Sequence, residues 1–169
     1  MEEDLHGGLG LNLGCGKKYW PGWINVDLYE AADLQSDTKK LPYEDNVVHV
    51  ICAIHLVEHL YAWEVPDILK EWKRVLKVDG KLILELPCLD KIFTYIAQCI
   101  IKNEPMKKQY SLWALWGEPF GHSEGMAHRW GYTIETMTLL LEALEFRNIK
   151  CMQPKYHLPF RDMRFEAIK

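Results

Sequence analysis

Two glycines and an acid near the start of the sequence have the clearest capacity to bind a ligand. In the run LGLNLGCG, Gly14 and Gly16 directly follow a short apolar segment, and Asp27 closes the next apolar segment, Trp23 to Val26. Glycine lets the backbone pass close under a ligand because it has no Cβ and adopts positive φ at little cost. A carboxylate at the end of the neighbouring strand can accept hydrogen bonds from a ribose diol. The pattern predicts a nucleoside site at two adjacent strand ends.

The spacing limits which nucleoside derivative this turn can hold. Binding of a dinucleotide pyrophosphate requires three glycines, a helix that begins at them, and an acid about 20 residues further on. Lys18 stands where the third glycine would fall, and the chain from Gly16 to Asp27 is too short for a helix followed by a strand. A nucleoside without phosphates, such as S-adenosylmethionine (SAM), therefore fits better. The alternative is an ordinary glycine turn that binds nothing.

Histidines form a second set of candidate chemical groups. The run His55-Leu56-Val57-Glu58-His59 has the H-x-x-E-H spacing of some zinc hydrolases, in which two imidazoles lie one helical turn apart. We expect this run to begin where a strand ends, and no downstream motif supplies a third acidic ligand. We therefore predict no metal site, with a zinc hydrolase as a remote alternative. Glu58 and His59 are then expected to form structural hydrogen bonds at a helix start.

Two more histidines lie in an aromatic stretch from Asn103 to Trp130 that glycine and proline interrupt. An imidazole titrates near neutral pH, so His122 or His128, like His55, could take a proton from an acceptor hydroxyl. Either could equally be a solvated loop histidine.

The same stretch holds candidate substrate-binding residues. Arg129 could bind an anionic substrate or pair with a surface carboxylate, and Trp130 could form an acceptor wall. Trp113 and Trp116 are expected in the core. We predict that residues 88–132 cover the site and bind the acceptor.

Composition describes one soluble domain, residues 1–169, with 49% apolar and 26% charged residues. A net charge of −4 argues against nucleic acid or a membrane surface as a partner. The acidic start, Met1 to Asp4, differs from a signal peptide, and the five cysteines show no CxxC spacing and are expected to be reduced. These features predict a cytoplasmic protein. Oligomeric state is not predicted.

Apolar periodicity alternates between strand and helix along the chain, which indicates an α/β fold with a mostly parallel sheet. The last two strands are expected to pair antiparallel. Asp79-Gly80 is expected to form a turn, Asp90 to cap the second helix, and Thr133 to cap the last. Predicted strands cover residues 9–13, 23–26, 31–35, 47–54, 81–86, 149–152 and 163–168, and predicted helices cover 64–77, 90–100 and 133–144.

Four ordered motifs, LNLGCG, NVD, LPYEDNVVHVICAIHLVEHL and EWKRVLKVDGKLILELP, together resemble the class I SAM-dependent methyltransferases. The small type-11-like members are the most similar. A weaker likeness, HRWGYTIETMTLLLEALEF, lies further on. The resemblance implies a Rossmann-like fold with an abbreviated first helix and a helical, aromatic insertion before the last helix. It also implies transfer of a methyl group from SAM to a small-molecule or glycan-type acceptor.

The resemblance assigns roles to residues that match the motifs. Leu13, Gly14, Cys15 and Gly16 would line the methionine end of SAM, and Asp27 would hold the ribose. Leu28 would lie against the adenine, Asp37 would accept from its amino group with Thr38 beside it, and His55 would stand near the methyl group.

The sequence departs from the family pattern at four places. Asn12 replaces the acid that opens the first motif, Lys18 replaces the third glycine, Val78-Asp79 replaces a Pro-Gly turn, and Glu145 replaces a glycine after the last helix. The altered edge of the first motif, together with the missing first helix, keeps open a second hypothesis, a SAM- or nucleoside-binding module without catalysis.

Overall fold

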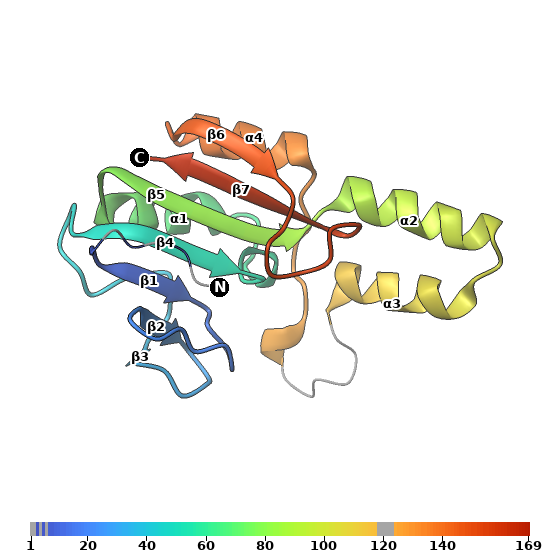
Figure 1. Ribbon diagram of the computed structural model, residues 1–169, viewed down its shortest axis with the longest axis horizontal. Helices are drawn as coiled ribbons and strands as arrows, with labels where there is room; N and C mark the ends of the chain where they lie inside the picture. Colours follow the sequence, from blue (N-terminus) through green and yellow to red (C-terminus); the bar gives the residue numbers. More distant parts are fainter. Residues whose placement is uncertain (1–2, 4, 6, 118–123) are drawn as a thin grey trace.

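The computed structural model describes residues 3, 5, 7–117 and 124–169, which form one seven-stranded sheet with helices at its carboxyl end and on one face (Figure 1). The strand order is β3-β2-β1-β4-β5-β7-β6. Neighbours pair in parallel except β7, which is antiparallel to both β5 and β6. The predicted Rossmann-like sheet with an antiparallel end is confirmed. The strands are β1 Gly10–Leu13, β2 Ile24–Asp27, β3 Leu34–Gln35, β4 Val48–Ile54, β5 Leu76–Pro87, β6 Arg147–Met152 and β7 Asp162–Ile168.

The helices are concentrated in the second half of the chain. No helix separates β1 from β2, β2 from β3 or β3 from β4 in the described chain, so the predicted loss of the first helix extends to the next two connections. The helical elements are η1 Val57–His59, α1 Val65–Val75, α2 Leu89–Ile101, α3 Pro105–Trp116, η2 Glu124–Met126 and α4 Ile134–Ala143.

The main core lies between one face of the sheet and the helices α1 and α4. Alternate residues of the central strands point to this face, as the period of a strand requires. Trp72 of α1 is fully buried there, and its indole N–H donates to the carbonyl of Thr38 at 2.8 Å. The main-core residues of the central strands and of these two helices include Leu11, Leu13, Ile51, Ala53, Leu82, Leu84, Phe165, Leu69, Met137 and Leu141.

The opposite face of the sheet carries no helix in the described chain, and loops cover it instead. Trp20 packs edge-on against Trp23, with ring centroids 5.1 Å apart, in a second small core with Val50, Cys52 and Ile83. Beside it Asn12, buried in β1, donates to the side-chain oxygen of Asn25 at 2.9 Å and to the carbonyl of Lys18 at 3.0 Å. These amides attach the connection between β1 and β2 to the sheet at the place where a helix would otherwise pack.

A buried ion pair organises the rest of this face. Glu85 of β5 and Arg164 of β7 face each other at 3.0 Å, and Glu85 also accepts from the backbone N–H groups of Lys155 and Tyr156. Arg164 further pairs with Glu3 and Glu166. The loop between β6 and β7 is therefore attached to the sheet through Glu85.

Several local predictions are wrong. Asp79 and Gly80 do not end a strand: Asp79 has φ 62° inside β5, where pairing with β4 slips between Val48 and Val50. Asp90 does not cap its own helix; its carboxylate accepts from the backbone N–H of Ile134, at the start of α4, at 3.2 Å.

The predicted cover contains a full helix, α3, that the interrupted aromatic pattern concealed. Trp116 at its end is exposed rather than in the core. The cysteines are free, as expected, although Cys151 is exposed rather than buried.

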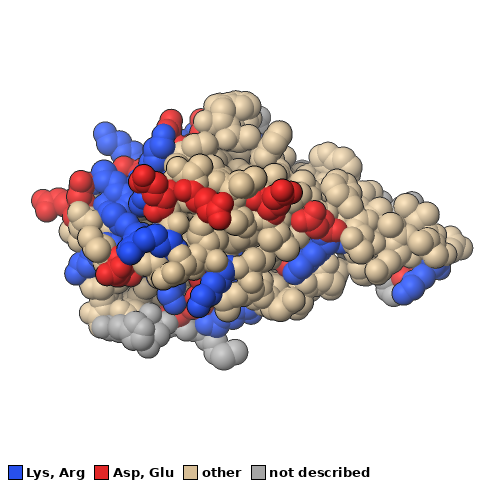
Figure 2. All heavy atoms as spheres, turned by 90° about the horizontal axis from the view of Figure 1, so that it is seen from above, with Lys and Arg blue, Asp and Glu red and all other residues tan. Residues whose placement is uncertain are grey.

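Helices α2 and α3 run side by side and project beyond the carboxyl end of the sheet (Figure 1). Phe93, Ile100, Ile101 and Trp116 are exposed on this projection. Charged side chains gather over the sheet and are sparse on the projecting end in the view of Figure 2. Among the described residues, no helix has the length and apolar character needed to cross a membrane.

Candidate functional site

The glycine turn and Asp27 meet at the carboxyl ends of β1 and β2. Gly14 and Gly16 have φ of 62° and 53°, in the left-handed region that favours glycine. Asp27 is buried, and its Oδ2 accepts from the backbone N–H of Gly16 at 2.8 Å. The sequence motif therefore folds into a turn that presents a carboxylate at its edge.

Asp27 is also a structural acceptor. Its Oδ1 accepts from the backbone N–H groups of Tyr29 and Glu30, each at 2.9 Å. A carboxylate offers about four acceptor positions, so three backbone donors leave about one for a ligand. A ribose could donate one direct hydrogen bond to Asp27 without displacing a backbone group, rather than the two that the sequence suggested.

The space over the turn differs between its two glycines. A Cβ at Gly16 would meet no atom within 4 Å, whereas a Cβ at Gly14 would lie 2.8 Å from the side chain of Leu56. The backbone is thus open to a ligand at Gly16, and Leu56 closes over Gly14. An open turn beside a carboxylate with a free acceptor position fits the nucleoside part of SAM.

The remaining residues that the resemblance assigned to SAM surround this turn with different exposures. Leu13 is fully buried in β1, and Leu28 is half-exposed directly after β2. Asp37 is exposed after β3, where its Oδ1 accepts from the backbone N–H of Lys39, and Thr38 is buried. Burial and the nearby Asp27 raise the pKa of Cys15 to about 11, so its thiol stays protonated and is not a nucleophile.

His55 lies at the end of β4, the strand next to β1, with φ 53°. Its Nδ1 lies 2.8 Å from Glu58 Oε1, and its Nε2 lies 3.6 Å from Asp162 Oδ2. Burial alone would lower the pKa of His55, but the Glu58 and Asp162 carboxylates outweigh it and raise the pKa to about 9. At neutral pH His55 is therefore a hydrogen-bond donor rather than the base predicted from the sequence.

The loop between β6 and β7 brings residues to the site that the sequence analysis missed. The His157 ring lies 4.0 Å from that of His55, and its Nε2 is 3.0 Å from Lys18 Nζ. Burial, together with the nearby His55 and Lys18, lowers the pKa of His157 to about 4. Asp162 is buried against Arg161; burial raises its pKa, but His55 and Arg161 outweigh this and lower it to about 2.

The expected antiparallel pairing of the last strands could have located these residues from the sequence. A strand antiparallel to β5 must begin where β5 ends, and Asp162 indeed pairs with Pro87. The polar stretch before the last strand therefore had to reach the carboxyl end of the sheet.

Glu58, His59 and His128 form a second group beside His55. Burial opposes ionisation of Glu58, but His55 outweighs it and lowers the pKa of Glu58. Burial lowers the pKa of His128. His122, the third predicted base, lies outside the described residues.

The H-x-x-E-H run does not form the geometry of the zinc hydrolase that the sequence analysis kept as a remote alternative. Its helical part is only the short η1, and the two histidines of the run belong to separate groups: His55 joins His157 and Asp162, while His59 joins Glu58 and His128.

The predicted substrate-binding pair lies next to the second group. The backbone N–H groups of Arg129 and Trp130 donate to the carbonyl of Glu58 at 2.8 and 3.2 Å. The Arg129 guanidinium stacks over the Tyr61 ring at 4.4 Å, while Trp130 is exposed.

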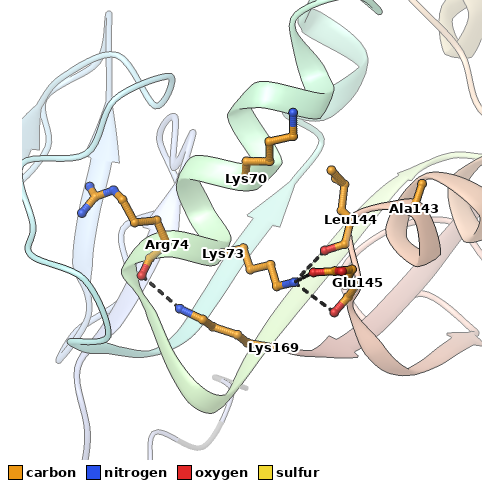
Figure 3. Close-up of a pocket in the computed structure, with 7 residues that line it drawn as sticks. All are labelled: Lys70, Lys73, Arg74, Ala143, Leu144, Glu145 and Lys169. Carbon is orange, nitrogen blue, oxygen red and sulfur yellow. Dashed lines mark hydrogen bonds and ion pairs between the residues drawn. The ribbon is translucent and has the colours of Figure 1, made fainter.

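A basic groove of about 400 Å³ at the opposite end of the sheet is not part of this site (Figure 3). Its cations are already paired: Lys73 with the carbonyls of Leu144 and Glu145, Arg74 with Glu71 and Asp45, and Lys169 with the carbonyls of Arg74 and Leu76. These contacts join α1 to the end of α4 and to the end of β7.

Comparison with family models matches part of the chain. Residues 11–84, which contain the glycine turn, Asp27 and His55, match the family model described as a methyltransferase domain. The match covers less than half of the 169 residues. No curated protein sequence matches the chain.

Solved structures of methyltransferases share this fold. The chain superposes on a SAM-dependent methyltransferase from Archaeoglobus fulgidus with a TM-score of 0.64 and 16% identity, covering 98% of this chain and 88% of that one. It superposes on a SAM-dependent methyltransferase from Methanosarcina mazei with a TM-score of 0.59 and 16% identity, covering 95% of this chain and 91% of that one. A third structure is that of the 1,6-didemethyltoxoflavin-N1-methyltransferase of Burkholderia thailandensis with bound 1,6-didemethyltoxoflavin and S-adenosylhomocysteine. Here the TM-score is 0.61 and the identity 12%, covering 95% of this chain and 70% of that one. At these identities the likeness establishes the shared fold.

Proposed function

We propose that this protein is a class I SAM-dependent methyltransferase. It moves the methyl group of SAM to a small-molecule or glycan-type acceptor bound beside His55, under the cover of residues 88–132. The observation that carries the proposal is the carboxylate of Asp27, held 2.8 Å from the backbone N–H of Gly16 at the open side of the glycine turn. In this arrangement Asp27 holds the ribose, Leu13, Gly14, Cys15 and Gly16 line the methionine end, and Leu28, Asp37 and Thr38 surround the adenine.

The acceptor class is supported by exposed aromatic side chains in the cover and in the loop before β7. Trp130 and Phe160 expose aromatic surface, and the Phe160 ring lies tilted against that of Tyr95 of α2 with centroids 4.6 Å apart. Aromatic faces suit planar small molecules and the apolar faces of sugars. The Burkholderia thailandensis enzyme holds a small molecule, 1,6-didemethyltoxoflavin, which agrees with this class. The cytoplasmic location and the absence of nucleic-acid and membrane partners stay predictions from composition.

The chain contributes mainly position to the proposed reaction. Bound SAM would supply a methyl group that is electrophilic because it is attached to a sulfonium. The protein must align an acceptor atom with that group and exclude water, which lowers the barrier through orientation. His55, held between Glu58 and Asp162 and stacked on His157, is fixed in place to orient the acceptor, and Arg129 and Trp130 contribute to its pocket.

The Asp27→Asn variant tests the proposal. An amide keeps the size of the carboxylate but loses its charge, so we expect SAM and S-adenosylhomocysteine to bind about 10-fold to 100-fold more weakly, as for a hydrogen bond to a charged group. Isothermal titration calorimetry measures this change. Asp37→Asn is the matched control, because its exposed carboxylate accepts from only one backbone N–H; a smaller loss is expected.

Two further results decide the outcome. The melting temperature of Asp27→Asn shows whether the fold survives, since the amide also replaces an acceptor for three backbone groups. Unchanged affinity in a folded Asp27→Asn variant would contradict the assigned ribose contact. Release of S-adenosylhomocysteine with a panel of sugars, phenols and amines identifies the acceptor, whereas tight binding without turnover on any of them would favour the binding module.

A further inference from the structure

Glu58, His59 and His128 bring three metal-ligating atoms together where the cover meets the end of β4. One such atom from each side chain lies within 4.8 Å of the other two. Glu58 and His59 belong to η1, and His128 follows η2 on the other side of the site. Neither the family match nor the proposed methyl transfer gives this group a role.

Glu58 is the unexplained member of the group. Its side chain is 1% exposed, and Oε2 has no hydrogen-bond partner among the described residues. Oε1 lies 2.8 Å from His55 Nδ1, and one carboxylate oxygen of Glu58 lies within 4.8 Å of a ring nitrogen of His59 and of His128. A buried carboxylate oxygen without a partner is costly, so a ligand that binds it would remove that cost.

Both imidazoles are oriented as metal ligands usually are. His59 Nδ1 lies 3.2 Å from the carbonyl oxygen of Ala127, and His128 Nδ1 lies 2.9 Å from that of Ala114. A carbonyl only accepts, so each Nδ1 carries the proton and each Nε2 keeps its lone pair. This Nδ1–H to carbonyl contact is the outer support that fixes the tautomer of metal-bound histidine.

The backbone holds the three side chains in place without a metal. The backbone N–H groups of Arg129 and Trp130 donate to the carbonyl of Glu58, so the segment of His128 is pinned against η1. The His59 and His128 rings meet edge to face with centroids 4.8 Å apart.

We propose that Glu58, His59 and His128 bind one divalent transition-metal ion of the Zn²⁺ class. Two neutral imidazoles and one carboxylate are the donor set that such ions take in proteins. Three protein ligands leave one coordination position for water. The ion joins η1 to the segment after η2 and so fixes the acceptor cover on the sheet. The metal site does not depend on the proposed acceptor.

The neighbouring group of His55, His157 and Asp162 is a poorer site. Lys18 Nζ lies 3.0 Å from His157 Nε2, and Arg161 forms an ion pair with Asp162 at 2.9 Å. A metal cation there would meet Lys18 and Arg161 in addition to His55, which also borders the proposed site through Glu58, and would displace their partners. It therefore supplies the matched control.

Zinc titration of the full chain tests the proposal. Protein treated with a chelator and then dialysed is titrated with ZnCl₂ by calorimetry, and a parallel sample receives CoCl₂ for absorption spectroscopy. We expect one ion per chain, a cobalt spectrum without a thiolate charge-transfer band, and a rise in melting temperature on adding zinc. His128→Ala and Glu58→Gln should each weaken binding by about 100-fold or more, because each removes a ligand itself rather than its outer support. His157→Ala should leave the affinity unchanged.

Three results would overturn the site. They are the absence of saturable one-to-one zinc binding, an affinity that His128→Ala leaves unchanged, and a loss of binding in His157→Ala. A thiolate band in the cobalt spectrum would place the ion on an exposed cysteine such as Cys151 and would also reject the proposal. Because Glu58→Gln alters a buried charge, His59→Ala serves as the replacement if that variant does not fold. None of these results depends on SAM affinity, so the test is separate from that of Asp27.

Discussion

Gly14 and Gly16 have the same left-handed backbone conformation but different surroundings. Both have positive φ, but only Gly14 has a side chain packed over it, that of Leu56. Gly16 faces open space, which is the side where a ligand would pass. The first glycine is required for packing and the second for access.

We therefore expect Gly14→Ala to destabilise the protein more than Gly16→Ala. Each alanine costs about 1–2 kcal/mol because a left-handed backbone crowds the Cβ. Gly14→Ala adds a contact of 2.8 Å with Leu56, for which a further cost of about 1–3 kcal/mol is typical of overpacking. Urea unfolding of both variants measures the difference.

The double variant Gly14→Ala with Leu56→Ala is the control for this prediction. In the absence of the Leu56 side chain, Gly14→Ala should lower the free energy of unfolding only as much as Gly16→Ala does. Equal losses in the two single variants would mean that Leu56 does not constrain the turn.

The sequence located the residues of this site that belong to local motifs. Asp27 ends β2, while Gly14, Gly16 and His55 closely follow the ends of β1 and β4. The carboxyl ends of parallel strands meet at one edge of the sheet. His157 and Asp162 were missed because their position depends on the reversed direction of β7, which no local motif carries. Two contacts distinguish the candidate metal group, from Nδ1 of His59 and of His128 to the carbonyls of Ala127 and Ala114. Ala114 lies in α3 and Ala127 directly follows η2, and the sequence analysis gave bounds for neither element.

Helix α4 is an element whose start was read correctly from the sequence. Thr133 Oγ1 accepts from the backbone N–H of Thr136 at 3.0 Å, and Thr136 Oγ1 accepts from that of Thr133 at 2.9 Å. A capping box of this kind supplies acceptors for helix N–H groups that have no partner in the helix itself. Asp90 adds a third acceptor from α2 and so links the two helices.

Thr133→Ala should lower the free energy of unfolding by about 1 kcal/mol, as loss of an N-cap usually does. Thr138→Ala is the matched control, since its hydroxyl only donates to the carbonyl of Ile134 within the same helix. Thermal unfolding followed by circular dichroism compares them. If Thr138→Ala lowered the free energy of unfolding as much as Thr133→Ala does, capping would not be the cause.

Helix α3 lies in the insertion that the resemblance implied to be helical, but the apolar periodicity did not reveal it. Its residues, PMKKQYSLWALW, mix charged and aromatic side chains without one apolar stripe. The helix packs on α2 and not on the sheet, so no wide apolar face is needed (Figure 1). The continuity of β5 through Asp79-Gly80 was missed for another reason: Asp79 takes a positive φ, as in the predicted turn, yet pairing with β4 resumes beyond it.

At the scale of the molecule, the helix-free face depends on ionic contacts where helices would normally supply apolar ones. Arg164 is 2% exposed and meets three carboxylates, those of Glu3, Glu85 and Glu166. Removal of one partner of a buried ion pair leaves the other charge without compensation. The attachment of the loop that carries His157 depends on this network.

Arg164→Met should lower the free energy of unfolding by about 3–5 kcal/mol, because it leaves Glu85 buried without its counter-charge. Lys81→Met is the matched control: Lys81 also pairs with Glu166, but it is 41% exposed, so its loss should be below about 1 kcal/mol. Urea unfolding of both variants at neutral pH gives the comparison. A small effect of Arg164→Met would show that the network is not needed to hold this face.

The absence of helices between β1, β2 and β3 also bears on the order in which the chain folds. Leu11 pairs with Ile24 and Val26 pairs with Leu34, so these parallel strands join residues that are near one another in the sequence. Lys81 of β5, in contrast, pairs with Ile168 of β7, so this pairing joins residues that are far apart in the sequence. Loop closure is faster for near neighbours than for distant ones. We therefore expect the glycine turn and its acid to form early, before the last strand locks the opposite half.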